Sequence, residues 1–237
     1  MNPRRRFPRC ALRMLVAAVV AAAAVGAVAP DEVAAVVRRL VSGCRVSVRE
    51  RTAEIFSRRP DVAAAAAGAG GPVRILVFKR ERIVEVEAPG WPKNRTYRMT
   101  GFSGRPGPKL REGDRQIPEG VYDCVGLNPN SAYCVSVKVG YPNAEERAHA
   151  AAEGRTAPGG NIFIHGGKAS VGCIPVGDEA AEEIFCFAAD CGVRPGGIVI
   201  APYDMRGVRE PEFERGIAAP PWYATMLDRL AATLDPI

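Results

Sequence analysis

His165 and Cys173 are the two residues whose types and spacing best suit chemistry, since they stand eight residues apart in the glycine-rich stretch NIFIHGGKASVGCIP. A cysteine becomes a strong nucleophile when it loses its proton, and a neighbouring imidazole can accept that proton. The pattern favours acyl transfer, with His165 as the base and Cys173 as the nucleophile. The alternative is a small buried thiol near a satisfied core histidine.

The segment that joins the pair is made mostly of small residues, which include Gly166, Gly167, Ser170 and Gly172. Gly172 directly precedes the cysteine, so the backbone there can adopt unusual angles and approach a substrate closely. An oxyanion hole built from backbone N–H groups needs such an approach. Ser170 can form a hydrogen bond within the loop. The glycines therefore favour the reactive interpretation over the buried one.

Short apolar runs bounded by turn residues predict the strands that would hold this pair. The expected strands are residues 73–80, 82–88, 95–102, 120–126, 132–140, 161–166 and 196–202. One helix should follow Asp178 and stop at Gly192, and an amphipathic helix should close the chain within residues 220–234. The predicted fold class is therefore α+β, dominated by strands.

The amino-terminal residues have the composition of an export signal. Residues 1–29 contain five arginines, no acidic residue, and an apolar run that ends in small residues. Such a segment is typical of a signal peptide or an N-terminal membrane anchor. Residues 30–71 are expected to form a helical spacer and an Ala/Gly linker. We expect an exported protein of the periplasm or cell envelope, with inner-membrane anchoring left open.

The formal charge of +6 does not indicate a nucleic-acid partner. Five of the arginines precede residue 30, and the rest of the chain holds 27 basic against 26 acidic side chains. A nucleic-acid surface needs a basic stripe, which this nearly neutral remainder lacks. We therefore expect no nucleic acid among the partners.

Six cysteines follow the export segment, and they are Cys44, Cys124, Cys134, Cys173, Cys186 and Cys191. Cys124 and Cys134 flank an Asn-Pro-Asn-Ser sequence that is expected to turn, so a cross-strand disulfide is one alternative. Cys186 and Cys191 should lie on different faces of a helix end, which makes their pairing less favourable. With both pairs formed, Cys173 and Cys44 would remain free thiols. No spacing is typical of zinc ligands, and neither a metal nor a cofactor is expected.

The stretch HGGKASVGCIPVGDEAAEEIF resembles the active-site motif of L,D-transpeptidases with the YkuD-type catalytic domain, specifically their YafK-like branch. The sequences GRPGPKLREGDRQIPEGVYDC, LNPNSAY and YPNAEERA resemble further motifs of that branch. The resemblance implies a strand-dominated YkuD-like β-sandwich or barrel, with one helix after the catalytic loop and helical extensions at both ends. The catalytic domain would span residues 72–203, and residues 204–237 would form a C-terminal extension.

The resemblance also implies a role for each residue of the loop. Cys173 would be the nucleophile and His165 the base, and the carbonyl of Gly166 would orient the imidazole. The N–H groups of Gly172 and Cys173 would hold the oxyanion, while Ser170 shapes the loop. The implied substrates are peptidoglycan stem peptides that contain diaminopimelate.

Three cationic residues are candidates for binding the carboxylates of the stem peptide. Lys109, Lys168 and Arg115 suit such anionic groups, but each is equally plausible as a solvated turn residue. His149, the only other histidine, is expected on a surface helix or loop. Pro175 stands where most family members have arginine, a departure that is typical of the YafK-like branch.

A thioester on Cys173 leaves two reactions open. Attack by an amine would make the protein a transpeptidase. Attack by water would make it an L,D-carboxypeptidase or amidase that releases a peptide or protein linked to diaminopimelate. Alternatives of another class are a catalytically inactive peptidoglycan-binding module and a structural domain in which Cys173 is paired in a disulfide.

Overall fold

The structure is a computed structural model that describes residues 45–207 and 209–234. The chain divides into two units, Met1–Val46 and Ser47–Ile237, and only the second falls largely within the described residues. The expected export segment and Cys44 lie outside them. None of the described helices combines the length and the apolar character that crossing a bilayer requires.

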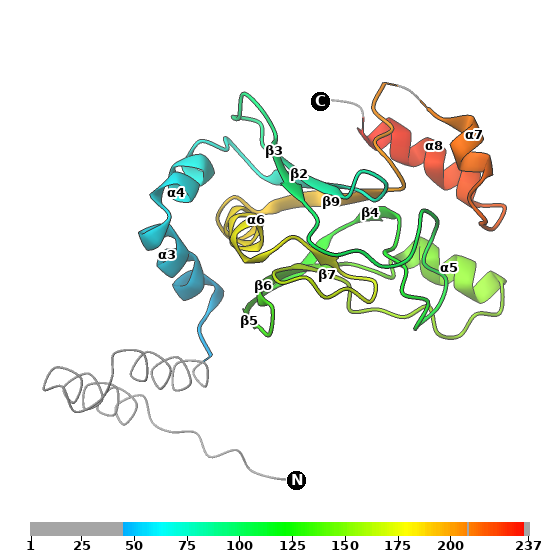
Figure 1. Cartoon of the computed structure of the whole chain (residues 1–237), viewed down its shortest axis with the longest axis horizontal. Coiled ribbons are helices and arrows are strands. Elements are labelled where there is room, and N and C mark those ends of the chain that lie inside the picture. The colour runs from blue at the N-terminus through cyan, green and yellow to red at the C-terminus, as the bar shows by residue number, and fades with distance from the viewer. Residues whose placement is uncertain (1–44, 208, 235–237) are drawn as a thin grey trace, which may run out of the picture. The chain divides into compact units, whose positions relative to one another are not determined.

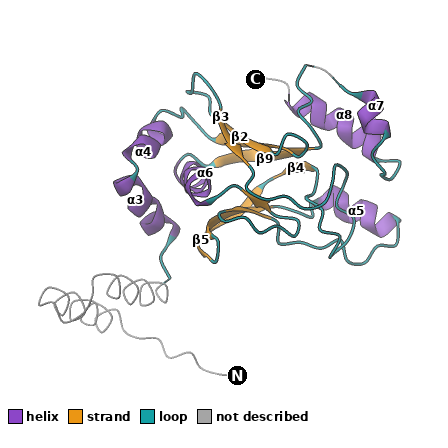
Figure 2. Ribbon diagram, viewed as in Figure 1, coloured by secondary structure: helices purple, strands orange, loops and turns teal. Residues whose placement is uncertain are grey.

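Two sheets of short strands lie at the centre of the second unit (Figure 1). Among the described residues, the first sheet has the strand order β3-β2-β1-β9-β4 and the second has the order β5-β6-β7-β8. The strands of the first are β1 Val73–Phe78, β2 Ile83–Glu87, β3 Arg95–Arg98, β4 Gly120–Tyr122 and β9 Val193–Ala201. Those of the second are β5 Cys124–Ser131, β6 Cys134–Val139, β7 Phe163–His165 and β8 Ile174–Pro175. Figure 2 shows the strands grouped together with the helices around them, which confirms the strand-rich α+β class.

Strand β1 is buried along its whole length, which explains its nearly unbroken apolar sequence. Ile75 and Val77 belong to the main core, whereas Leu76 and Phe78 belong to a second apolar cluster with the C-terminal helix. β1 pairs antiparallel with β2 and parallel with β9. A strand that is covered on both faces needs apolar side chains at odd and even positions alike.

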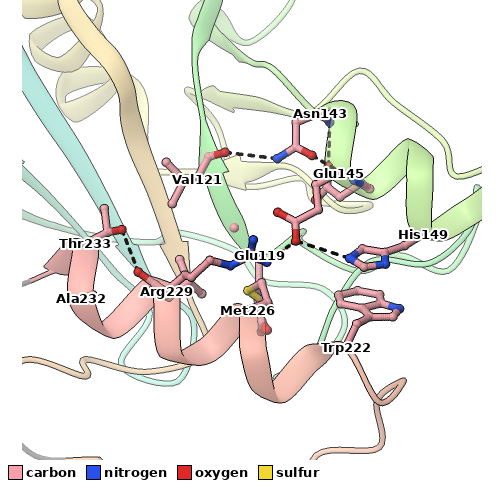
Figure 3. A pocket seen from close by; sticks show the side chains of 13 residues that line it. Glu119, Val121, Asn143, Glu145, His149, Trp222, Met226, Arg229, Ala232 and Thr233 are labelled. Carbon is pink, nitrogen blue, oxygen red and sulfur yellow. Dashed lines mark hydrogen bonds and ion pairs between the residues drawn. The ribbon is translucent and has the colours of Figure 1, made fainter.

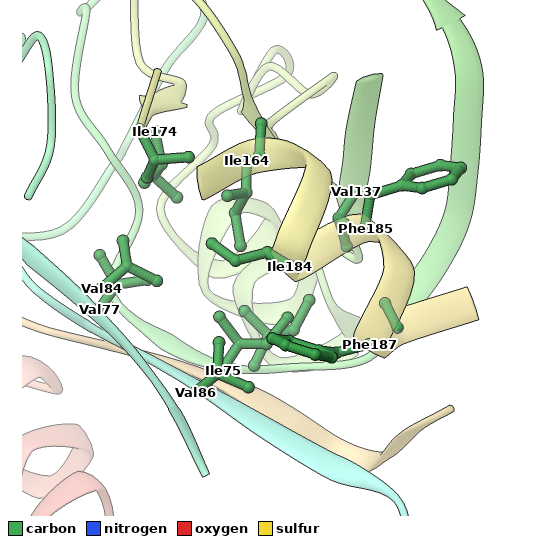
Figure 4. Packing of buried hydrophobic residues seen from close by; sticks show 14 of the residues in the cluster. Ile75, Val77, Val84, Val86, Val137, Ile164, Ile174, Ile184, Phe185 and Phe187 are labelled. Carbon is green, nitrogen blue, oxygen red and sulfur yellow. The ribbon is translucent and has the colours of Figure 1, made fainter. Parts of the chain in front are cut away.

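Helix α6, Asp178–Asp190, lies in the main core and begins where the sequence predicts a helix. Its residues from Ala181 to Ala188 are all buried. Figure 4 shows Ile184 and Phe187 of this helix packed among apolar side chains of both sheets, including Ile75 and Ile164. The candidate catalytic loop, residues 166–172, joins His165 to Cys173. The helix that follows this loop and β8 is thus fixed against both sheets.

The amino-terminal helices α3, Val48–Arg58, and α4, Pro60–Ala67, lie within the segment that is expected to form a helical spacer and linker. Ile55 and Val62 are fully buried in the main core. Arg58 pairs with Glu182 of α6, and Arg59 pairs with Glu183 at 2.5 Å. The helices therefore belong to the domain, and the helical run breaks at Pro60 because proline has no N–H to donate within a helix.

The β5–β6 hairpin turns later than the sequence predicts. β5 runs on through the Asn-Pro-Asn-Ser sequence, and Ser131 pairs with Cys134 across the turn. Pro129 is tolerated there because β5 is an edge strand with a register shift at this end. Cys124 pairs with Val139 at the far end of the ladder, so the two cysteines lie far apart and the predicted disulfide between Cys124 and Cys134 does not form. All five cysteines within the described residues are free thiols.

Three further helices cover the side of the domain where the chain ends (Figure 1). They are α5 Ala144–Ala152, α7 Pro211–Arg215 and α8 Tyr223–Leu234. α8 is the amphipathic helix predicted for residues 220–234, and Leu227 and Leu230 bury its apolar face against β1 and β9. α5 begins at a capping box in which Asn143 and Glu146 exchange hydrogen bonds.

Candidate active site

His165 is the last residue of β7, and Cys173 directly precedes the neighbouring strand β8. The two strands pair in parallel, with Ile164 opposite Ile174 and His165 opposite Pro175. Both isoleucines are buried in the main core. Cys173 directly precedes Ile174, and its thiol contacts the Asn161 carbonyl and the Phe163 N–H. The cysteine therefore lies beside the start of β7, and His165 lies at the end of that strand.

The imidazole of His165 is held by the carbonyl of the next residue. Nδ1 lies 2.5 Å from Gly166 O, and the side chain is almost completely buried. A carbonyl oxygen can only accept, so Nδ1 carries the proton and Nε2 of the neutral ring is free to act as a base. Burial lowers the pKa of His165 below its ordinary value, although the Gly166 hydrogen bond acts in the opposite direction. The ring is thus a neutral base in a fixed tautomer.

Cys173 is half-buried, and its thiol donates to Asn161 O at 3.7 Å. Burial raises the pKa of this thiol, while the Phe163 N–H and the charge of Lys109 oppose the rise. Among the described residues, no hydrogen bond joins the thiol to His165. Burial therefore favours a neutral thiol and a neutral imidazole in the resting pair.

The loop before the cysteine is fixed by two serines. Gly172 N–H donates to Ser103 Oγ at 2.7 Å, and Ser170 Oγ donates to Cys173 O at 2.7 Å. The two hydroxyls also contact each other at 2.8 Å. Gly172 has a φ of +107°, and a Cβ there would lie 2.9 Å from Gln116 O, so only glycine fits. In this structure the Gly172 N–H, which is expected to help hold the oxyanion, donates instead to Ser103 Oγ.

Gly166 occupies a position where any side chain would clash. A Cβ on this residue would lie 2.3 Å from Asp178 Oδ1 and 2.8 Å from Tyr133 O. The neighbouring Gly167 N–H donates to Asp178 Oδ1 at 2.8 Å, and its carbonyl accepts from Thr100 Oγ1 at 2.5 Å. The carbonyl that orients His165 is therefore anchored from α6, from the β5–β6 turn and from the loop after β3.

Sequence reasoning missed Ser103, Tyr133 and Asp178 as parts of this site. Ser103 contacts a residue 69 positions later in the chain, and GFSG offers no motif that would single it out. The sequence indicates Asp178 only as the first residue of a helix, although its carboxylate also accepts a hydrogen bond from the Gly167 N–H of the loop. Tyr133 lies in LNPNSAY, one of the segments that carries the family resemblance.

The three cationic candidates for substrate binding differ in their surroundings. Lys109 is buried, and its Nζ lies 2.6 Å from Asp114 Oδ1 and 2.9 Å from Arg111 O. These contacts stabilise the loop of residues 109–114, and binding of a substrate carboxylate by Lys109 stays a prediction. Lys168 and Arg115 are both exposed, and Lys168 directly follows the diglycine of the catalytic loop.

His149 takes no part in the pair formed by His165 and Cys173. It lies on α5, where its ring stacks on Trp222 at 4.2 Å and faces Glu145 Oε1 at 3.4 Å. Figure 3 shows both rings at a cavity of about 420 Å³ between α5, β4 and α8. No residue of the catalytic loop lines this cavity, so the expectation of a histidine on a surface helix is confirmed.

Two comparisons concern curated proteins and solved structures. YafK of Escherichia coli K12, a protein named as a candidate L,D-transpeptidase, is 36% identical over 123 residues, which cover 50% of this chain and 48% of YafK. YafK of Escherichia coli O157:H7 matches equally well, so the chain spans about half the length of these curated relatives. The helical cell shape determining protein Pgp2 from Campylobacter jejuni is 24% identical, with a TM-score of 0.40 over 55% of this chain and 47% of that one. Bd1075 of Bdellovibrio bacteriovorus is 19% identical, with a TM-score of 0.36 over 57% and 49%.

The sequence profile of the YkuD family matches most of the domain that carries the two sheets. The match covers residues 72–200, which include both members of the candidate catalytic pair and the loop that joins them. It begins just before β1 and ends within β9. The chain therefore belongs to the family of the YkuD L,D-transpeptidase catalytic domain.

Proposed function

We propose that this protein is a cysteine acyltransferase that acts on peptidoglycan stem peptides through a thioester on Cys173. The observation that carries the proposal is the placement of His165 at the end of β7 and of Cys173 just before its partner strand β8, with the imidazole oriented by Gly166 O. Membership of the YkuD family and the likeness to YafK support peptidoglycan as the substrate.

In the first half-reaction, His165 Nε2 takes the proton of the Cys173 thiol while Sγ attacks the carbonyl carbon of the stem peptide. The Cys173 N–H donates to the resulting oxyanion, and the Gly172 N–H joins it after leaving Ser103 Oγ. The C–N bond then breaks, and the protonated imidazole gives its proton to the departing D-alanine amine. A thioester remains on Cys173.

In the second half-reaction, His165 Nε2 takes a proton from the acceptor as the acceptor attacks the thioester carbon. The C–S bond breaks, and the thiolate of Cys173 recovers its proton from the imidazole. An amine acceptor gives a new peptide bond, which is the outcome we propose. Water in its place gives hydrolysis through the same residues.

The test incubates the purified protein with peptidoglycan sacculi and identifies the released and retained products by mass spectrometry. We expect release of D-alanine, altered muropeptides and an acyl adduct on Cys173. Cys173→Ala should be inert, whereas Cys191→Ser, at the far end of α6, should keep its activity. Full turnover by Cys173→Ala would overturn the mechanism. Binding to sacculi without turnover by the wild type would identify an inactive binding module.

We also propose that the domain works outside the cytoplasm, in the periplasm or cell envelope. The proposed substrate lies there, and residues 1–29 have the composition of an export signal. Fractionation of cells that express the full chain should recover the protein with the envelope. Recovery of the native protein in the cytoplasm would contradict this location.

A further inference from the structure

Tyr133 lies directly against the catalytic histidine and the two glycines after it. Its ring centroid is 4.8 Å from that of His165, and the two rings are tilted by 38°. A Cβ built on Gly167 would lie 3.3 Å from Tyr133 Cδ1, and the Tyr133 carbonyl accepts from the Gly166 N–H at 3.1 Å. The tyrosine thus covers the segment that orients the imidazole.

The ring of Tyr133 and the thiol of Cys173 approach His165 from different ends of β7. Cys173 precedes Ile174, which pairs with Ile164, so the cysteine lies beside the start of the strand. Tyr133 contacts the residues that follow the strand. Tyr133 and Cys173 therefore lie beside different ends of the strand that ends in His165.

Tyr133 is too exposed for a residue that only fills a core. It is 47% exposed, and its hydroxyl has no hydrogen-bond partner in residues 45–207 and 209–234. Its position is nevertheless fixed, because Ser131 Oγ accepts the Tyr133 N–H at 3.1 Å. Arg51 of α3 also donates to Pro129 O on the same hairpin at 3.2 Å. A braced ring that faces solvent on one side and the catalytic base on the other suits a functional position.

We propose that Tyr133 is a positioning residue that shields one side of the His165 imidazole from water and so keeps the ring in its neutral, basic form. The proposed role in catalysis rests on the proposed function, but the shielding of the ring does not. Water that reached this side of the ring would favour the charged form of the imidazole.

Burial has a larger effect on the pKa of His165 than any neighbouring group. Burial is the first cause of the lowered pKa of His165, and the Gly166 carbonyl is the second. The titratable or charged groups nearest to it are Tyr133 and Cys134 from the hairpin, Asp178 from α6, and Cys173 and Lys109 on the side of the thiol. None of these charged groups is a cause of the shift. Removal of the covering ring should therefore raise the pKa.

The first measurement is an NMR titration of the two imidazoles in the full chain, with His149→Gln used to assign the signals. We expect Tyr133→Ala to raise the pKa of His165 by about half a unit or more towards the ordinary value of roughly 6.5. Tyr133→Phe keeps the ring and should leave the pKa unchanged. Val125→Ala removes another exposed side chain of the same hairpin and should also change nothing. An unchanged pKa in Tyr133→Ala would overturn the proposal.

The second measurement connects the shielding to catalysis. The rate of Cys173 acylation by p-nitrophenyl acetate is followed across pH, and intact mass identifies the acetylated residue. The acid limb of the profile should move upward in Tyr133→Ala by the same amount as the NMR pKa, and should stay in place in Tyr133→Phe. Acid limbs that coincide despite a shifted pKa would overturn the catalytic role of Tyr133. Failure of the wild type to form any adduct would instead count against the proposed function, and the NMR result would still decide the shielding.

Discussion

His165 ends β7 and Cys173 directly precedes the neighbouring strand β8, yet the imidazole and the thiol are each hydrogen-bonded to a backbone carbonyl and not to each other. The thiol donates to Asn161 O and Nδ1 donates to Gly166 O. Burial favours the neutral form of both groups, since it raises the pKa of the thiol and lowers that of the imidazole. The proton should therefore move during attack on the substrate, from a thiol that is intact at rest.

The first prediction concerns the pH dependence of acylation. A lowered pKa keeps His165 neutral below its ordinary value of about 6.5, so acylation in the wild type should persist below neutral pH. His165→Gln should lose about 10²-fold or more in rate and recover only as the pH approaches the raised pKa of Cys173. Rates from about pH 5 to about pH 9 test this, with His149→Gln as the control. Superimposed profiles for wild type and His165→Gln would show that His165 is not the base.

The second prediction concerns the backbone that orients the imidazole. Gly166→Ala would place a methyl group 2.8 Å from the backbone carbonyl of Tyr133 and 2.3 Å from Asp178 Oδ1, so we expect the loop to shift and its carbonyl to move away from Nδ1. A misplaced base should lower the acylation rate by about 10²-fold. Gly126→Ala is the matched control, because a Cβ there meets only Lys138 Cβ at 3.9 Å. Equal rates for the two variants would contradict the role of the Gly166 carbonyl.

The third prediction tests whether α3 is part of the folded domain or a loosely attached spacer. Ile55 is fully buried in the main core, so Ile55→Ala should lower the free energy of unfolding by about 2–5 kcal/mol. Ser57→Ala, an exposed change on the same helix, should alter it by no more than about 0.5 kcal/mol. Denaturant unfolding of both variants provides the measurement. A loss below about 1 kcal/mol in Ile55→Ala would support the spacer instead.

The fourth prediction concerns the capping carboxylate of α5. Burial raises the pKa of Glu146 to about 7, against an ordinary value of about 4.5. The folded protein therefore binds more protons than the unfolded chain between these values, and this contribution to stability is present at low pH and lost as pH rises to about 7. The loss should be roughly 2–3 kcal/mol, and it should be absent in Glu146→Gln. A pH dependence that is identical in both proteins would exclude Glu146 as its source.

The sequence predicts those parts of the site that depend on neighbouring residues. His165, Gly166, Gly172 and Cys173 are joined by one short loop, so their types and order were sufficient to single them out. Helix α6 was equally accessible, because its apolar period and its start at Asp178 are local signals.

Local sequence patterns could not predict contacts between segments that are distant in the chain. Ser103 and Tyr133 reach the catalytic loop only after the sheets have formed, and neither has a motif that announces this contact. The hairpin was misplaced because Asn-Pro-Asn-Ser normally favours a turn, whereas an edge strand can include Pro129. The packing of α3 could not be read from its sequence, since an amphipathic helix does not reveal which surface it covers.

The attachment of α3 and α4 to α6 also determines how the domain would respond to a pulling force. Tension applied to the chain at Ser47 would act first on α3, whose Arg58 pairs with Glu182 and whose Ile55 is buried in the core. These contacts must rupture before the load reaches the sheets. The same helix α6 holds Gly167 through Asp178, four residues before Glu182. In a single-molecule extension experiment, α3 and α4 should therefore detach as an early, separate event before the sheets unfold.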